Sequence, residues 1–113
     1  MSISETEFLR HILAECDYLL LEAEQNSFNE FFENPRLSRA VCRSLEIIGE
    51  ASSKIHPDLK AKFSHIPWRE MSDIRNKIIH HYFGIDYDII WDTIKTDIPI
   101  LREWIESVIQ AEE

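Results

Sequence analysis

The chain contains few residues that turn the backbone sharply or cross-link it. It has two glycines and four prolines in 113 residues, which are too few turn residues for an all-β domain. Its two cysteines, Cys16 and Cys42, are too few for a disulfide framework and lack the spacing of metal ligands. Both fall at apolar positions of helical periodicity, and we therefore expect buried thiols.

Long apolar segments and glycine-rich loops are missing as well. No run of about 18 apolar residues predicts a membrane span, and no apolar segment follows a basic start as in a secretory signal peptide. The sequence also lacks a Gly-rich phosphate loop and a nucleophile-elbow serine. We therefore expect a cytoplasmic protein with no membrane association and a single domain over residues 1–113.

The charge is negative overall but unevenly spread. The net charge is −9 at pH 7. Residues 1–34 contain one basic and eight acidic residues, residues 35–81 contain nine basic and five acidic residues, and residues 82–113 contain two basic and eight acidic residues. A basic middle between acidic ends fits one local surface that attracts anions. Charge scatter around a solvated bundle is the alternative interpretation.

Apolar residues recur at helical spacing along the whole chain, and capping signals divide it into segments. The sequence therefore predicts an all-α fold, an up-down bundle of four to five main helices with short connections. The expected segments are a helix over residues 4–25, a short helix opened by the Ser27–Glu30 capping box, a helix from Asn34-Pro35 to about residue 55, a short helix or turn over 56–64, a helix over 67–83, and two helices capped by Asp86 and Asp97.

Two details of these helices bear on function. Gly84 is placed to end the helix over 67–83 in the left-handed conformation. The outer side of the helix that follows Asn34-Pro35 carries arginines and glutamates three or four positions apart: Arg36, Arg39, Arg43, Glu46 and Glu50. Pairing of these charges on a wet face is the favoured interpretation. An RNA-facing role for the arginines is the alternative.

The segment from Arg75 to Tyr82 concentrates chemically useful groups within eight residues. It contains the Arg75 guanidinium, the Asn76 carboxamide, the His80 imidazole and the Tyr82 phenol. Imidazole transfers protons near neutral pH, and guanidinium matches the geometry of phosphate. These groups suit a metal-free site that cleaves phosphodiesters. The polar side of an ordinary helix would also explain them, and Tyr82 could be a core aromatic residue.

An ideal helix constrains how these groups could meet. Asn76 and His80 would share one side, whereas Arg75 would lie about 140° from His80. The two would converge if the long Arg75 side chain curled round, if a local bulge realigned them, or if a second subunit contributed its own copy. Apolar Ile79 and Phe83 beside the polar groups suggest a covered surface, which a symmetric dimer would provide.

A metal site is not expected. His80 and His81 are adjacent and would point about 100° apart on a helix, and no third ligand is in register. His81 falls next to the apolar stripe and is better interpreted as a structural histidine. We predict neither a metal nor another cofactor.

The residues around this segment resemble a known family. Arg75, His80 and Tyr82 match the Arg-x4-His-x-Tyr motif of HepT-like toxins in the HEPN superfamily. An ordered series of further matches covers nearly the whole chain: residues 45–51, 66–69, 71–76, 82–86 and 90–91.

The resemblance implies an all-α homodimer whose two motifs line a shared cleft. It implies a metal-independent endoribonuclease, the toxin of a type VII toxin–antitoxin pair, with RNA as substrate and an MNT-type nucleotidyltransferase antitoxin as partner. His80 would then be the general acid or base, and Arg75 would stabilise phosphoryl charge. Asn76 would orient the imidazole or hold a phosphate oxygen, and Tyr82 would accept AMP from the antitoxin and thereby silence the toxin.

Two other classes of function remain open. One is a non-catalytic helical module that presents nucleotides or substrates to a nucleotidyltransferase partner. The other is a purely structural helical adaptor. The presence of both Arg75 and His80 favours the enzyme over either.

Overall fold

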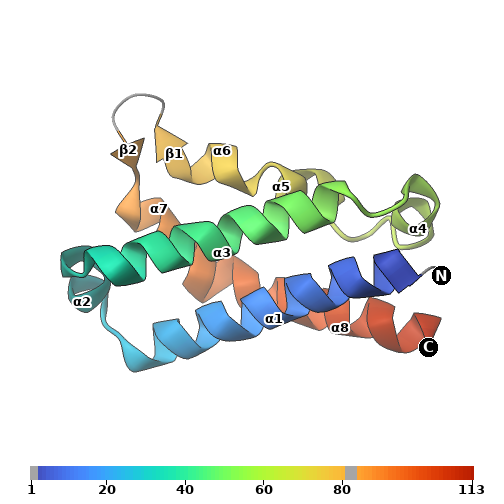
Figure 1. Ribbon diagram of the computed structural model, residues 1–113, viewed down its shortest axis with the longest axis horizontal. Helices are drawn as coiled ribbons and strands as arrows, with labels where there is room; N and C mark the ends of the chain where they lie inside the picture. Colours follow the sequence, from blue (N-terminus) through green and yellow to red (C-terminus); the bar gives the residue numbers. More distant parts are fainter. Residues whose placement is uncertain (1–2, 81–83) are drawn as a thin grey trace.

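Two long helices, α1 (Ile3–Gln25) and α3 (Pro35–Ser53), run side by side along the length of the bundle (Figure 1). The computed structural model describes residues 3–80 and 84–113. In it, α8 (Ile98–Glu112) packs against α1, and α5 (Trp68–Ser72) and α6 (Ile74–Ile78) pack against α3. A short helix, α4 (Pro57–Lys62), joins α3 to α5 at one end. The all-α prediction is confirmed.

Local capping signals place the connection between the two long helices. The predicted Ser27–Glu30 capping box opens α2 (Phe28–Glu33), with each side chain accepting a hydrogen bond from the other residue's backbone N–H. Asn34 ends α2 and also caps α3, because its Oδ1 accepts from the Leu37 N–H at 3.1 Å. Pro35 suits the first turn of α3, where its missing N–H costs nothing.

One continuous apolar core lies between the helices. The inner stripe of α1 buries Leu9, Ile12, Cys16 and Leu19 completely, and it meets the buried stripes of α3 and α8. Burial of such side chains is worth about 1.5–3 kcal/mol each and drives the assembly of the bundle. Cys16 and Cys42 are free, buried thiols, as predicted.

The last quarter of the chain is helical without interruption. It comprises α7 (Tyr87–Asp92), a π-helical turn η2 (Thr93–Asp97) and α8. Asp86 caps α7 as predicted, with its Oδ1 accepting from the Ile89 N–H at 3.0 Å. The predicted cap at Asp97 is wrong: its backbone is helical and its side chain makes no capping bond. Ile94, Ile98 and Leu101 continue a buried stripe through this point, so packing favours a continuous helix over a new start.

The predicted helix over 67–83 is also wrong. The backbone breaks at Asp73 between α5 and α6 and leaves the helical path after Ile78. There β1 (Ile79–His80) pairs antiparallel with β2 (Gly84–Ile85). β-branched residues favour extended backbone, and the Ile78 carbonyl accepts from the Asp86 N–H at 3.0 Å. Gly84 does have the positive φ predicted for it, 93°, but in this hairpin rather than at a helix end.

The two ends of the bundle differ in what they carry. The start of α1 and the end of α8 lie together, and an ion pair joins Arg10 to Glu113 at 3.7 Å. The β1–β2 hairpin lies at the opposite end, above α7 (Figure 1). Over the described residues, every helix is too short or too polar to cross a membrane.

Candidate functional site

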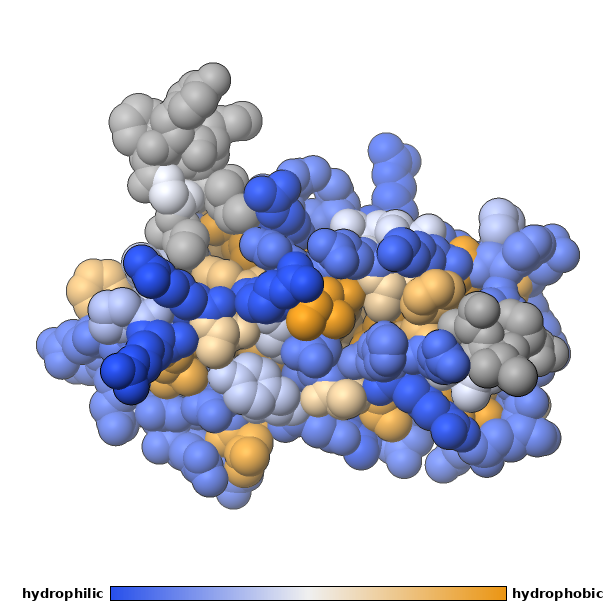
Figure 2. Space-filling model, in the orientation of Figure 1, coloured by the Kyte–Doolittle hydropathy of each residue, from blue (hydrophilic) through white to orange (hydrophobic). Residues whose placement is uncertain are grey.

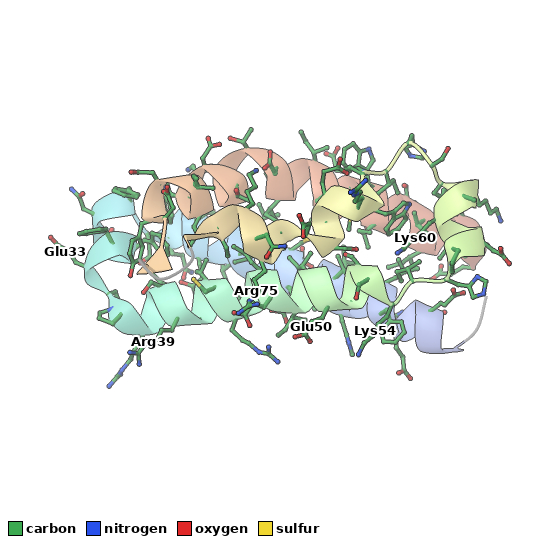
Figure 3. All side chains as sticks on the ribbon, turned by 90° about the horizontal axis from the view of Figure 1, so that it is seen from above. Glu33, Arg39, Glu50, Lys54, Lys60 and Arg75 are labelled. Atoms are coloured by element: carbon green, nitrogen blue, oxygen red, sulfur yellow. The ribbon has the colours of Figure 1, made fainter. Side chains whose placement is uncertain are left out.

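Helix α6 holds the arginine of the motif at the surface of the bundle. The helix has five residues, and two of them, Ile74 and Ile78, are buried and anchor it on the core. Between these anchors Arg75 points outward with 65% of its side chain exposed. In Figure 3 it reaches from α6 towards α3. The backbone of Arg75 is therefore held in place by its buried neighbours, and its guanidinium is accessible to solvent.

The charges around Arg75 alternate across the boundary between α3 and α6. Arg75 Nε lies 3.8 Å from Glu46 Oε1, and Glu46 Oε2 lies 3.5 Å from Arg43 Nη1. The same Arg43 nitrogen lies 3.7 Å from Glu50. Exposed pairs of this kind are worth about 0–1 kcal/mol. They orient the Arg75 side chain but hold it too weakly to prevent binding of another anion. An incoming phosphate can compete for its guanidinium.

A depression with a volume of about 470 Å³ lies at this boundary. Its lining includes Arg75, Ser72 and the α3 residues Glu46 and Glu50. Gly49 allows the close approach that shapes it, because a Cβ there would lie 3.2 Å from the Ser72 carbonyl oxygen and 3.4 Å from Ile74 Cγ2. The sequence predicted the two glutamates only as partners of arginines on their own helix. The ion pair between Glu46 and Arg75 joins two helices, so no local sequence pattern indicates it.

Asn76 is exposed and is held at the start of α6. Its Nδ2 donates to Asp73 Oδ1, and its backbone N–H donates to the Asp73 carbonyl at 3.0 Å. These bonds fix the carboxamide two residues before the end of the helix. Its predicted action on His80 or on a phosphate oxygen stays a prediction.

His80 lies on β1, with its backbone paired to Gly84. The helix ends two residues earlier, so the 140° separation from Arg75 that an ideal helix imposes does not hold here. A local bulge in a continuous helix was one of the three arrangements expected to bring Arg75 and His80 together. The chain instead leaves the helix before His80. His81, Tyr82 and Phe83 lie outside the described residues.

The arginines of α3 divide into two groups. Arg43 pairs with glutamates of its own helix, as the favoured interpretation predicted. Arg36 and Arg39 are exposed and have no ion-pair partner among residues 3–80 and 84–113. Within the same ranges no three His, Cys, Asp or Glu side chains gather as metal ligands would.

A comparison with family models bears on the chemistry of this site. The model of ribonuclease HepT-like proteins matches residues 7–108, which include α3, α6, the hairpin and the motif. The chain belongs to the HepT-like ribonuclease family. The resemblance seen in the motif therefore extends to the whole bundle.

Several HepT-like relatives match over most of this chain. A protein of Caldanaerobacter subterraneus subsp. tengcongensis, provisionally named an RNase, is 43% identical over 94% of this chain and 95% of its own. A probable ribonuclease HepT of Thermococcus cleftensis is 39% identical over 96% of this chain and 98% of its own. In Methanocaldococcus jannaschii, a protein whose name joins a gamma-glutamylcyclotransferase to a provisional RNase is 35% identical over 91% of this chain and 46% of its own. No solved structure matches.

Proposed function

We propose that this HepT-like protein is a metal-independent endoribonuclease and the toxin of a type VII toxin–antitoxin pair. The observation that carries the proposal is the exposed Arg75 guanidinium, which lies at a surface depression in the short helix that directly precedes the strand with His80. The order of these residues is that of the family motif. An arginine that is loosely paired and open to solvent is suited to binding a phosphodiester.

The reaction would use the RNA's own 2′-hydroxyl. That oxygen attacks the adjacent phosphorus, its proton leaves to a base, and the bond to the 5′-oxygen breaks as that oxygen takes up a proton. His80 would carry out one or both proton transfers, and Arg75 would stabilise the negative charge on the phosphoryl oxygens in the transition state. The products would be a 2′,3′-cyclic phosphate and a 5′-hydroxyl. No step requires a metal.

The active species would be a homodimer, with a nucleotidyltransferase antitoxin as its regulator. An apolar groove of about 440 Å³ borders the motif helix on the side of α8, and Met71, Ile74, Leu101 and Trp104 contribute to its lining. A second copy packed on this groove would bring the two motif segments near one another. The antitoxin would silence the dimer by transferring AMP to Tyr82.

Cleavage of labelled RNA in the presence of EDTA tests the proposal most directly. Wild-type protein should produce fragments ending in a cyclic phosphate. His80→Ala should lower the rate by about 10²–10⁴-fold because the proton-transfer group is lost. Arg75→Ala should lower it by a similar factor because phosphoryl charge is left uncompensated.

Arg69→Ala is the matched control, since Arg69 is also an exposed arginine but lies in α5 outside the motif. It should cleave as the wild type does. Undiminished cleavage by folded His80→Ala protein would remove the ribonuclease assignment from this site. Binding of RNA without cleavage by the wild type would favour the non-catalytic module instead.

A further inference from the structure

Arg36 lies at the start of α3, where helix electrostatics disfavours a basic side chain. The first turns of a helix favour acidic side chains, because the helix dipole is positive there. This chain has 21 acidic residues, yet the first turn of α3 has none and carries Arg36, with Arg39 following. Departures from local preference that have no structural gain mark functional positions. Arg36 and Arg39 gain no ion pair within the described part of the chain.

An exposed aromatic residue precedes these arginines, four positions before Arg36 in the sequence. Phe32, in the last turn of α2, has 55% of its surface exposed. Its ring stacks on the ring of Phe28, with the centroids 6.0 Å apart, and packs edge-to-face with Tyr87, with the centroids 5.2 Å apart. Phe31 and Trp91 lie behind, with their rings 5.2 Å apart. Phe32 therefore packs against this aromatic cluster with part of its ring and leaves more than half of its surface open to solvent.

The arginines of α3 form a row that extends towards Arg75. Arg36, Arg39 and Arg43 lie within about 60° of one another around α3, and Arg43 connects through Glu46 to Arg75. Figure 3 shows Arg39 pointing outward from α3 while Arg75 reaches from α6 towards that helix. In Figure 2 strongly hydrophilic side chains gather over the part of α3 nearest α2, beside apolar patches at that end.

We propose that Phe32, Arg36 and Arg39 form a subsite for single-stranded RNA that lies upstream of the cleavage motif. Arg36 and Arg39, about 5–6 Å apart at Cβ, bind consecutive phosphates, and an unpaired base stacks on the open face of Phe32. The strand then continues along α3 to Arg75. This inference rests on the proposed ribonuclease function and names its substrate class: RNA that is single-stranded over the nucleotides next to the cleaved bond.

The chemistry favours a nucleic acid over an acidic protein as the occupant. Stacking on exposed aromatic rings combined with arginine contacts to phosphates is the common mode of single-strand binding. An acidic protein surface would need the arginines but not an open ring. The chain as a whole is acidic, with a net charge of −9, so its other surfaces repel RNA and confine it to this one.

Binding and cleavage are measured separately so that the two proposals can fail separately. Fluorescence anisotropy of a 2′-O-methyl RNA 12-mer measures binding to wild-type protein, because this probe lacks the attacking hydroxyl. Arg36→Ser/Arg39→Ser should weaken binding and lower the slope of log Kd against log salt by about 1.4, or 0.7 for each lost phosphate contact. Phe32→Ser should weaken it about fivefold or more, and Phe32→Trp should restore it.

Three controls sharpen the result. Arg10→Ser/Arg69→Ser removes the same charge elsewhere and should leave the salt slope unchanged. A blunt duplex of the same sequence has no unpaired base, so Phe32→Ser should not affect its binding. Arg36→Glu should raise the melting temperature by improving the charge at the start of α3 and should nevertheless weaken RNA binding. A merely structural role would not produce these opposite changes.

The binding and cleavage results distinguish failure of the subsite from failure of the ribonuclease function. If wild type cleaves RNA and the three subsite variants bind the probe as tightly as wild type, the subsite is overturned and the ribonuclease function stands. If wild type binds through the subsite but cleaves no RNA, the function falls and the subsite stands. If Arg36→Ser/Arg39→Ser loses binding to a nucleotidyltransferase partner but not to RNA, the surface docks a protein and the inference is wrong.

Discussion

Cys16 is enclosed by the core on the inner side of α1, and burial raises the pKa of its thiol to about 12, with a smaller contribution from Asp17. Below pH 9 the thiol is protonated in both the folded and the unfolded chain and adds no pH dependence. Between pH 9 and about 12 the unfolded chain loses this proton and the folded chain keeps it. The free energy of unfolding should therefore fall by about 1.4 kcal/mol per pH unit from this group.

Urea unfolding followed by tryptophan fluorescence from pH 8 to 10.5 measures this effect. Cys16→Ala leaves a small cavity, which lowers stability by a constant amount, and it removes the titrating group. The stability difference between wild type and Cys16→Ala should therefore shrink as the pH rises above 9. Parallel pH profiles for the two proteins would contradict the assignment.

The regulatory role proposed for Tyr82 makes a second prediction for a single side chain. AMP transfer joins the phenol oxygen to the α-phosphorus of ATP, with loss of the phenol proton and release of pyrophosphate. The product carries about one more negative charge and a bulky nucleoside. That charge can pair with a nearby arginine and occupy the place of a substrate phosphate. Tyr82→Phe should keep cleavage activity but escape silencing by the antitoxin and ATP.

Intact-mass spectrometry after incubation with antitoxin and ATP is the decisive measurement. The wild-type mass should rise by one or more AMP units, and the Tyr82→Phe mass should not change. Tyr87→Phe is the matched control, because Tyr87 packs within the aromatic cluster, and this variant should be labelled like wild type. Equal labelling of Tyr82→Phe and wild type would place the modification on another residue.

At the scale of elements, the position of α6 depends on one missing side chain. Gly49 lets α3 approach the α5–α6 segment, and a Cβ there would lie 3.2 Å from a backbone oxygen that cannot rotate away. Gly49→Ala should therefore push α5–α6 outward, while its better helix propensity offsets part of the strain, so that stability changes by about 1–2 kcal/mol or less. Cleavage should fall about tenfold or more, because small displacements of catalytic groups are costly.

Single-turnover cleavage and thermal melting, measured on the same preparation, separate the two effects. Glu24→Ala in α1 is the control for a gain in helix propensity on an exposed face, and it should cleave normally. Unchanged cleavage by folded Gly49→Ala protein would mean that the spacing of α3 and α6 does not matter to the reaction.

The starts of α2, α3 and α7 could be predicted from the sequence, whereas the hairpin that carries His80 could not. Ser27, Asn34 and Asp86 each satisfy backbone N–H groups a few residues away, so the sequence contains the whole interaction. The hairpin after Ile78 depends on pairing with β2, and two isoleucines are too short an apolar pattern to distinguish a strand from a helix. The motif residues could be named from sequence, whereas the Arg75–Glu46 contact required the packing of two helices.

At the scale of the whole molecule, the proposed dimer predicts a mass of about 27 kDa, twice the chain mass of 13.4 kDa. The apolar groove between α5–α6 and α8 includes Ile100, which is 48% exposed. Ile100→Glu should place a charge in the interface and shift the protein towards monomer in sedimentation experiments. Leu21→Glu, at a similarly exposed apolar position on α1, should leave the dimer intact.

Activity measurements complete this test. If two copies share one cleft, the Ile100→Glu monomer should cleave RNA far more slowly than wild type at equal chain concentration. A wild-type protein that sediments as a monomer at micromolar concentration and still cleaves RNA would show that each chain holds a complete site.

The shared location of the start of α1 and the end of α8, opposite the hairpin, has a consequence for how such a domain can be joined to others. A covalent extension at either terminus leaves the bundle on the side away from Arg75 and the α2–α3 surface. Fusion, tethering to a surface or attachment of a reporter should therefore be sterically neutral for RNA. In the M. jannaschii relative a matching segment makes up 46% of the chain, so there the matching segment is part of a longer protein.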